Sequence, residues 1–292
     1  MIFRVALEVD LRSMYEVFYQ NEVHDSSYPP TPGELPSYLR HILQTGQMYV
    51  TEEDGVVIAF AGAITRGTIT FLTDLFVHPA HQSGQLGKTL LHSVLPQDAL
   101  THCTVSSSDP RALALYIRAG MHPHWPVFAL QREKSTHKIP LPSEIEIIEA
   151  DPHDPAFIHW DAQIGGRLRP VDHLYWVREQ QAIPLWFRRQ GQSVGYGYIR
   201  LGAGTLWHPH ACALGPIGVT APEDATDCVL AAVKKGMQEA EVLHIEVPGP
   251  HPCLAPLLES GFRISYVDTF VSTTATPFFD ARCYIPSGGD LL

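Results

Sequence analysis

The sequence predicts a mixed α/β fold, with α+β mixed sheets, built as two tandem units of similar layout. A hairpin pattern around a central glycine occurs at residues 48–65 and again at 183–201. A helix pattern with Pro at its start and Gly at its end occurs at residues 106–121 and again at 248–262. Because the two patterns follow each other at a similar interval both times, we interpret the chain as a repeat.

Within the first unit, strand and helix patterns alternate. Apolar residues at Leu11, Met14 and Phe18 follow a helical period. Asp54-Gly55 is a signal for a tight hairpin turn. The expected elements, in chain order, are a strand at 3–9, a helix at 11–20, a loop at 24–36, a short helix at 34–43, the hairpin at 48–65, a strand at 68–77, a helix at 84–95, a strand at 102–107 and a helix from 110.

The limits of the units follow from composition. A polar stretch with two prolines at residues 132–144 is typical of a linker. We therefore expect a first domain at 1–138, a linker at 139–143 and a second domain at 144–280. The tail at 281–292 is expected to be mobile.

Composition excludes several classes of function. The formal net charge is −11 and neither half carries a basic stripe, which argues against nucleic acid as a partner. No apolar run reaches the length of a membrane span, and the start has no apolar signal region, so we expect no membrane partner and a cytoplasmic location. The five cysteines form no CxxC pair, and the histidine pairs lack a third ligand, so no metal is expected. A homodimer is possible.

A candidate anion-binding loop lies in residues 77–95, VHPAHQSGQLGKTLLHSVL. Here an apolar strand ends, a short loop with two glycines follows, and a helix begins. The unpaired N–H groups and the positive dipole end of such a helix favour an anion. This pattern by itself is more often an ordinary turn between a strand and a helix than a phosphate site.

The surrounding motifs resemble the GNAT N-acetyltransferase family over nearly all of residues 1–130. The loop resembles the family pattern Gln/Arg-x-x-Gly-x-Gly/Ala, and the segment 109–121 resembles Asn-x-x-Ala-x-x-Leu-Tyr-x-x-x-Gly-Phe. The sequence departs from these patterns where Gln85 replaces the middle glycine, Asp109 replaces Asn and Met121 replaces Phe. The side chain of Gln85 could crowd a pyrophosphate, and Gly84 could offset this by a small shift of the loop.

The resemblance implies acetyl-CoA, or another acyl-CoA, as the acyl donor substrate and an amine as the acceptor. It also implies that the loop and short helix at residues 19–40 receive this acceptor. The pyrophosphate of the donor would lie on the N–H groups of residues 82–88, its pantetheine arm along residues 75–77, and its acyl group where the two central parallel strands separate. The implied cofactor-binding residues are Leu75, Phe76, Val77, Gln82, Ser83, Gly84, Gln85, Leu86, Gly87, Lys88 and Asp109.

Two residues are candidates for the proton transfers that amine acylation requires. Tyr116 matches the family tyrosine near the sulfur of CoA, and its phenol could protonate the leaving thiolate. Asp109 is placed to cap the helix that carries Tyr116. The alternative reading of Tyr116 is a core aromatic. Asp74 lies in an apolar strand, where the resemblance implies a base or an anchor for the amine. Its alternatives are an exposed strand edge or a pairing with an arginine.

The second unit resembles the same family in layout but not in chemistry. The counterpart of the loop has lost its glycines and carries Glu223, Asp224 and Asp227, which would repel a pyrophosphate. The counterpart of Tyr116 is Leu257. We therefore predict two tandem GNAT-like acetyltransferase units, the second degenerate and without a CoA site. The function predicted is acetyl transfer to an amine, small molecule or peptide, in the first unit. The alternative is a tandem GNAT-fold protein that binds or senses without catalysis.

Overall fold

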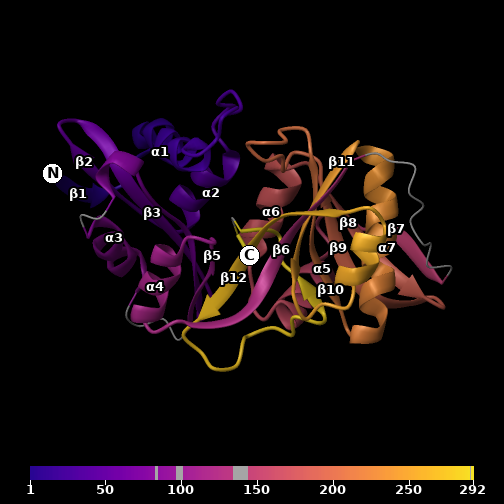
Figure 1. Cartoon of the computed structure of the whole chain (residues 1–292). Coiled ribbons are helices and arrows are strands. Elements are labelled where there is room, and N and C mark those ends of the chain that lie inside the picture. The colour runs from indigo at the N-terminus through magenta and orange to yellow at the C-terminus, as the bar shows by residue number, and fades with distance from the viewer. Residues whose placement is uncertain (83–84, 97–100, 134–143, 290) are drawn as a thin grey trace. The chain divides into compact units, whose positions relative to one another are not determined.

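The computed structural model describes residues 1–82, 85–96, 101–133, 144–289 and 291–292 (Figure 1). The chain forms two compact units, Met1–Thr104 and Val105–Leu292, and each is described by itself. The predicted linker, 139–143, lies outside the described residues.

The first unit is a sheet with helices on both of its faces. Figure 1 shows α1 and α3 on either side of β3. The sheet order is β1-β2-β3-β4-β5, antiparallel except for the parallel pair β4 and β5. The elements are β1 (Ile2–Val5), η1 (Glu8–Asp10), α1 (Leu11–Val23), α2 (Ser37–Thr45), β2 (Gln47–Glu53), β3 (Val56–Arg66), β4 (Ile69–Val77), η2 (Pro79–His81), α3 (Leu86–Val94) and β5 (Thr101–Ser106), whose last two residues belong to the second unit.

The local patterns explain why these elements form. Asp54 and Gly55 adopt φ values of 50° and 83°, which is the geometry of the expected tight hairpin turn between β2 and β3. β3 is apolar along nearly its whole length because helices cover both of its faces. Met14, Leu39 and Leu90 come from three different helices and are all fully buried in this core.

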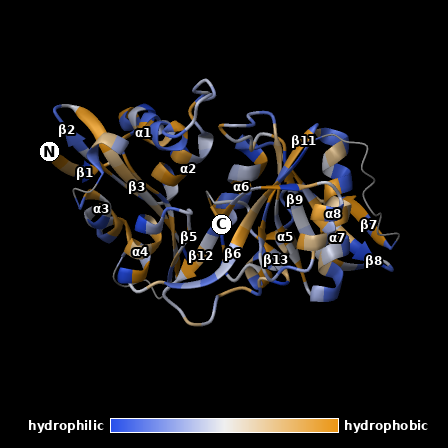
Figure 2. Cartoon of the chain, viewed as in Figure 1, coloured by the Kyte–Doolittle hydropathy of each residue, from blue (hydrophilic) through white to orange (hydrophobic). Residues whose placement is uncertain are grey.

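The second unit is a larger sheet of order β12-β6-β11-β10-β9-β8-β7, with β13 paired to β10. Figure 1 shows the long helix α7 alongside this sheet, and Figure 2 shows that α7 carries both polar and apolar residues, as a helix with one buried face should. The elements are α4 (Pro110–Arg118), β6 (His122–Glu133), β7 (Ile145–Glu149), α5 (Pro155–Ile164), α6 (Pro170–Glu179), β8 (Ala182–Arg189), β9 (Gln192–Arg200), β10 (Cys212–Val219), α7 (Pro222–Glu239), β11 (Val242–Pro248), α8 (Leu254–Glu259), β12 (Arg263–Ser272) and β13 (Tyr284–Ile285).

The compact units do not coincide with the sequence repeats. β6 closes the first repeat in sequence, but it pairs with β11 on one side and with β12 on the other. Its register runs from Val242 opposite Glu133 to Pro248 opposite Val127 on the β11 side. Because β6 is hydrogen-bonded on both sides to strands of the second repeat, it joins the second unit, and the compact units divide at Thr104 rather than near residue 138.

The expectation of a mobile tail is wrong. Residues 284–285 form β13 and pair with Gly218 and Ile217 of β10. Leu291 and Leu292 are 0% and 1% exposed. The apolar residues of the tail pack into the second unit, which its glycines and prolines did not suggest.

Burial gives the second unit a pH-dependent stability. His251 is buried, its Nδ1 accepts from the Cys253 N–H at 3.3 Å, and desolvation lowers its pKa from 6.5 to about 4 although Asp280 opposes this shift. In the unfolded chain His251 takes up a proton below pH 6.5, but in the folded chain it does so only near pH 4. The contribution of His251 to stability is therefore full above pH 6.5 and decreases as the pH falls from 6.5 to 4.

We predict that the free energy of unfolding contributed by His251 decreases by up to about 3 kcal/mol as the pH falls from 7 to 4. Urea titrations of the wild type and of His251→Gln across this range measure the difference. The variant should lose less stability than the wild type over this range. Equal slopes in the two proteins would contradict the assignment.

Candidate active site

The two parallel strands of the first unit separate part of the way along β4. Pairing joins residues Ile69–Phe71 of β4 to Thr101–Cys103 of β5. Thr104 Oγ1 then donates to the Leu72 carbonyl at 2.8 Å. In the described chain, the pairing of β4 with β5 goes no further, while β4 continues beside β3 to Val77. We call residues 73–77 the diverging segment of β4.

A β-bulge sets the orientation of Asp74 at the start of the diverging segment. Ala63 of β3 lies opposite Leu72, and Gly62 lies opposite Asp74, so Thr73 is an extra residue in β4. Asp74 is 4% exposed, which excludes the alternative of an exposed strand edge. Its Oδ2 accepts from Thr73 Oγ1 at 2.7 Å. A buried carboxylate held in this way is oriented by its neighbours rather than by solvent.

Tyr38 is a site residue that the sequence did not indicate. It lies in α2, and its hydroxyl donates to Asp74 Oδ1 at 3.1 Å. α2 was expected near this position as part of the acceptor region, but the helix pattern does not show which side chain reaches β4. The contact joins the acceptor-side helix to the candidate base.

Tyrosines also organise the loop at 24–36 before α2. Tyr19 Oη donates to the Pro30 carbonyl at 2.8 Å, and Tyr15 Oη accepts from the Gly33 N–H at 3.1 Å. Tyr28, in contrast, is 90% exposed. The region expected to receive the acceptor is therefore fixed to α1 at two points.

The turn after β4 leads directly into α3. The side-chain amide of Gln82 donates to the Val77 carbonyl at 3.3 Å and to Asn21 Oδ1 at 3.2 Å, which ties the turn to β4 and α1. Ser83 and Gly84 lie outside the described residues. The first backbone bond of α3 runs from the Thr89 N–H to the Gln85 carbonyl at 3.1 Å. The N–H groups of Leu86, Gly87 and Lys88 therefore form the first turn of α3, and Lys88 is exposed.

Gln85 holds a left-handed backbone conformation as the N-cap of α3, with φ 62° and ψ 3°. A side chain is strained in this region and glycine is not, which explains why the family pattern has glycine here. The Gln85 side chain is exposed. The substitution thus keeps the backbone turn that glycine would form and adds strain to it.

Asp109 and Tyr116 lie in the second unit, in α4. As the sequence predicted, Asp109 caps this helix: its Oδ1 accepts from the Arg111 N–H at 2.8 Å. The hydrogen bond from the Arg111 side chain lowers the pKa of Asp109. α4 ends at Arg118, and Gly120, two residues later, has φ 89°. Tyr116 is 6% exposed, which agrees both with a core aromatic and with a catalytic phenol.

The equivalent turn in the second unit is occupied by an ion-pair cluster. α7 begins with Glu223 and Asp224 in its first turn. Arg189 bonds Asp227 at 2.7 Å and Asp224 at 2.8 Å, and these contacts raise the pKa of Arg189. The start of α7 therefore carries carboxylates and their own cation, and it offers no site for a pyrophosphate.

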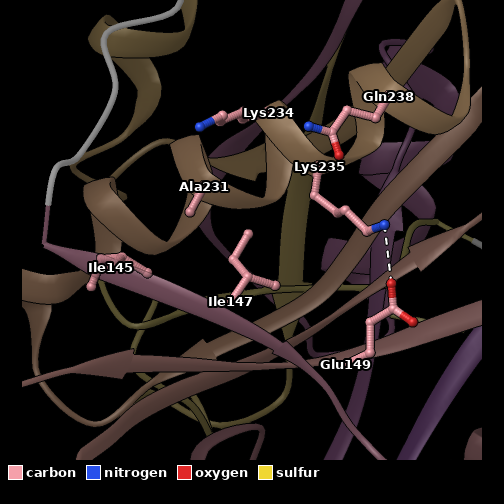
Figure 3. Close-up of a pocket in the computed structure, with 7 residues that line it drawn as sticks. All are labelled: Ile145, Ile147, Glu149, Ala231, Lys234, Lys235 and Gln238. Atoms are coloured by element: carbon pink, nitrogen blue, oxygen red, sulfur yellow. Dashed lines mark ion pairs between the residues drawn. The ribbon is translucent and has the colours of Figure 1, made fainter. Parts of the chain in front are cut away.

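A shallow pocket of about 370 Å³ lies elsewhere, between β7 and α7 (Figure 3). Lys235 crosses it to pair with Glu149 at 3.0 Å, and Lys235 also pairs with Glu239. It is lined by Ile145, Ile147, Glu149, Ala231, Lys234, Lys235 and Gln238. These ion pairs engage Lys235. None of the residues that line the pocket belongs to the motifs of the sequence analysis.

The described residues form neither a cluster of metal ligands nor a membrane-spanning helix. Among the described residues, no group of three or more His, Cys, Asp or Glu side chains is placed to hold a metal ion. In the same part of the chain, no helix combines the length and the apolar character that spanning a bilayer requires.

Comparison with known proteins confirms the resemblance. Residues 9–121 match the model of the Acetyltransferase (GNAT) family. No curated protein matches the sequence. The family segment covers the loop and both motifs of the first repeat.

Solved structures extend the same fold over the whole chain. A candidate acetyltransferase from Pyrococcus horikoshii has a TM-score of 0.75 at 14% identity, over 99% of this chain and 95% of its own. A GCN5-related N-acetyltransferase from Sphaerobacter thermophilus scores 0.66 at 14% identity, over 96% and 97%. A tandem GNAT protein from the clavulanic acid biosynthesis pathway scores 0.66 at 15% identity, over 94% and 99%. The chain therefore has the tandem GNAT fold.

We predict that Gln85→Gly raises the free energy of unfolding by about 1 kcal/mol, because glycine removes the left-handed strain. Thermal or urea unfolding measures this change. The control is Thr89→Gly, three residues into α3, where a helical backbone makes glycine neutral or unfavourable. A loss of stability in Gln85→Gly equal to that of the control would contradict the conformation described.

Proposed function

We propose that this protein is an N-acetyltransferase that uses acetyl-CoA, or another acyl-CoA, as acyl donor and acts in its first repeat. The observation that carries the proposal is the diverging segment of β4, followed within one turn by the N-terminus of α3. The diverging segment offers free strand backbone to an extended amide chain. The N-terminus of α3 offers N–H groups to a phosphate. An acyl-CoA molecule combines these two chemistries.

The residues present fit this donor substrate. Leu75, Phe76 and Val77 are half-buried and lie on the part of β4 that has left β5, where their backbone suits a pantetheine arm. The N–H groups of Leu86, Gly87 and Lys88, with the Lys88 ammonium, suit the pyrophosphate. Gln85 is exposed and keeps the left-handed backbone of the family glycine, which supports the same course of the turn. Gln82, Ser83, Gly84 and Asp109 stay assigned to the donor by the family motif alone.

The chemistry requires a proton acceptor for the amine and a donor for the leaving sulfur. Bound acyl-CoA supplies a thioester, whose carbonyl carbon is the electrophile. Asp74 takes a proton from the amine, directly or through water, so that the nitrogen can attack this carbon. As the C–S bond breaks, Tyr116 gives its proton to the sulfur. Tyr38 and Thr73 keep the Asp74 carboxylate in one orientation.

We predict that Asp74→Asn and Tyr116→Phe each lower kcat/KM by about 10²- to 10⁴-fold, the usual contribution of one acid or base. Initial rates with acetyl-CoA over panels of polyamines, aminoglycosides, amino acids and peptide N-termini first identify an acceptor, and the variants are then compared with it. The control is Tyr28→Phe, an exposed tyrosine of the acceptor loop. If both site variants keep the wild-type kcat/KM while folding normally, both assignments are wrong.

The second candidate function is binding or sensing without catalysis. It is favoured by Gln85, which departs from the family pattern, and by the acidic start of α7 in the second unit. Acetyl-CoA binding without turnover on any amine of the panel would support it. The acceptor, a cytoplasmic location and a homodimer stay predictions.

A further inference from the structure

The second unit repeats the strand divergence of the first. β10 and β11 run parallel and pair only over Cys212–Leu214 and Leu243–Ile245. β10 then has an irregularity between Leu214 and Ile217, as β4 has a bulge at Thr73. Each strand leads into a helix, α7 and α3 respectively. The second unit therefore has the opening that would receive a pantetheine arm, although its α7 turn is unsuited to phosphate.

The chain's own tail lies in this opening. Tyr284 and Ile285 pair with Gly218 and Ile217, and the Val219 N–H donates to the Cys283 carbonyl at 2.9 Å. Further along the tail, Gly289 lies next to the carboxylate of Glu246, the first residue of β11 beyond its pairing with β10. The tail thus follows β10 where β10 leaves β11, and it reaches the facing part of β11.

Three buried arginines hold the tail by its main-chain oxygens. Arg200 donates to the Ser287 carbonyl, and its Nε donates to the Gly215 carbonyl at 2.8 Å. Arg167 donates to the oxygens of both Leu291 and Leu292, and Arg169 donates to Leu292 at 2.7 Å. All three arginines are 5% exposed or less. Since a buried guanidinium needs acceptors, withdrawal of the tail would leave several of these donors without partners.

We call the residues of the second unit that contact the tail the tail-binding site. At its far end lies a polar network around Arg169. Arg169 bonds both oxygens of Asp161, at 2.7 and 2.8 Å, and also Tyr284. Tyr196 and His173 bond Asp161 as well. Desolvation raises the pKa of Asp161, but the charge of Arg169 outweighs it and holds that pKa far below its usual range. The Asp161 carboxylate thus pairs with Arg169, whereas Arg167 donates to the main-chain oxygens of Gly165, Leu291 and Leu292.

Two glycines of the tail-binding site let the backbone of the tail, and of the segment before it, approach closely. Gly215 has φ 132°, and a Cβ there would lie 2.3 Å from the Pro286 carbonyl oxygen. Gly166 has φ 75°, and a Cβ there would lie 2.1 Å from the Phe278 carbonyl oxygen. Glycine is therefore required at both positions for the tail and the segment that precedes it to approach so closely.

We propose that the second unit contains a peptide-binding site, in the place of a lost acyl-CoA site, and that residues 283–292 are its resident ligand. The ligand class is an extended segment with apolar side chains at its end, read by strand pairing with β10 and by arginines on its main-chain oxygens. The comparison with acyl-CoA rests on the proposed function of the first repeat, but the site itself does not. In this arrangement the tail excludes acyl-CoA from the second unit.

The test is complementation in trans, with no acetyl-CoA present. A chain of residues 1–282 should bind a labelled peptide of residues 283–292 with a stoichiometry of one and should regain thermal stability, whereas the full chain should not bind it. The control peptide carries Leu291→Asp and Leu292→Asp and should bind at least about tenfold more weakly, because it would bury two added charges. Equal binding of both peptides, or equal binding to both chains, would overturn the proposal.

A second measurement applies if the shortened chain does not fold. In the full chain, Leu291→Asp with Leu292→Asp should release the tail and increase hydrogen exchange at the Val219 amide, which bonds Cys283, by at least about tenfold. The matched control is Leu258→Asp, an exposed leucine of α8 in the same unit, which should leave this exchange unchanged. Wild-type exchange at Val219 in the double variant would overturn the proposal. Because neither readout involves catalysis, failure of the proposed function would leave both results intact.

Discussion

The structure depends on two pairs of parallel strands, one in each unit. In each pair the strands are hydrogen-bonded for only a few residues and then separate. In the first unit the separation follows Phe71 and Cys103, and in the second it follows Leu214 and Ile245. A strand that leaves its partner in the interior exposes backbone groups, and buried backbone groups need partners. Each opening therefore has to be filled, by a ligand or by another part of the chain. This requirement links the fold to the function that we propose.

The two repeats meet this requirement in different ways. In the first, the turn before α3 presents N–H groups of a helix start, and the Gln85 backbone keeps the left-handed conformation that the family pattern gives to glycine. In the second, Arg189 and its carboxylates occupy the start of α7, and residues 283–285 lie along β10. The loss of the glycine loop and the presence of the tail are thus two parts of one change. On our two proposals, the same fold binds a small-molecule acyl donor in one repeat and a peptide in the other.

Local sequence signals predicted the elements well. The turns at Asp54-Gly55 and at Gly191 and the cap at Asp109 form as expected, because each depends on residues only a few positions apart. The tandem GNAT arrangement was also correct, because its motifs recur in order. The strand expected at 3–9 ends at Val5, where the 3-10 turn η1 soon follows.

The features that the sequence did not predict depend on distant partners. The pairing of β6 with β11 and β12, the docking of the tail and the reach of Tyr38 to Asp74 each join segments far apart in the chain. The spacing of apolar residues along the sequence does not show which distant segments contact each other. The tail was misjudged because Ser287 and its glycines are typical of a loop, whereas its stability comes from arginines more than 80 residues away. The available signal was the apolar residues Tyr284, Ile285, Leu291 and Leu292, since such side chains are costly to expose.

A calorimetric titration of the full chain with acetyl-CoA tests the central claim most directly. The account predicts saturable binding near the micromolar range with one site per chain, because only the first repeat combines a diverging strand with a helix start that accepts phosphate. Two sites per chain would contradict the assignment of the second opening to the tail. Absence of binding at millimolar acetyl-CoA would contradict the proposed function itself.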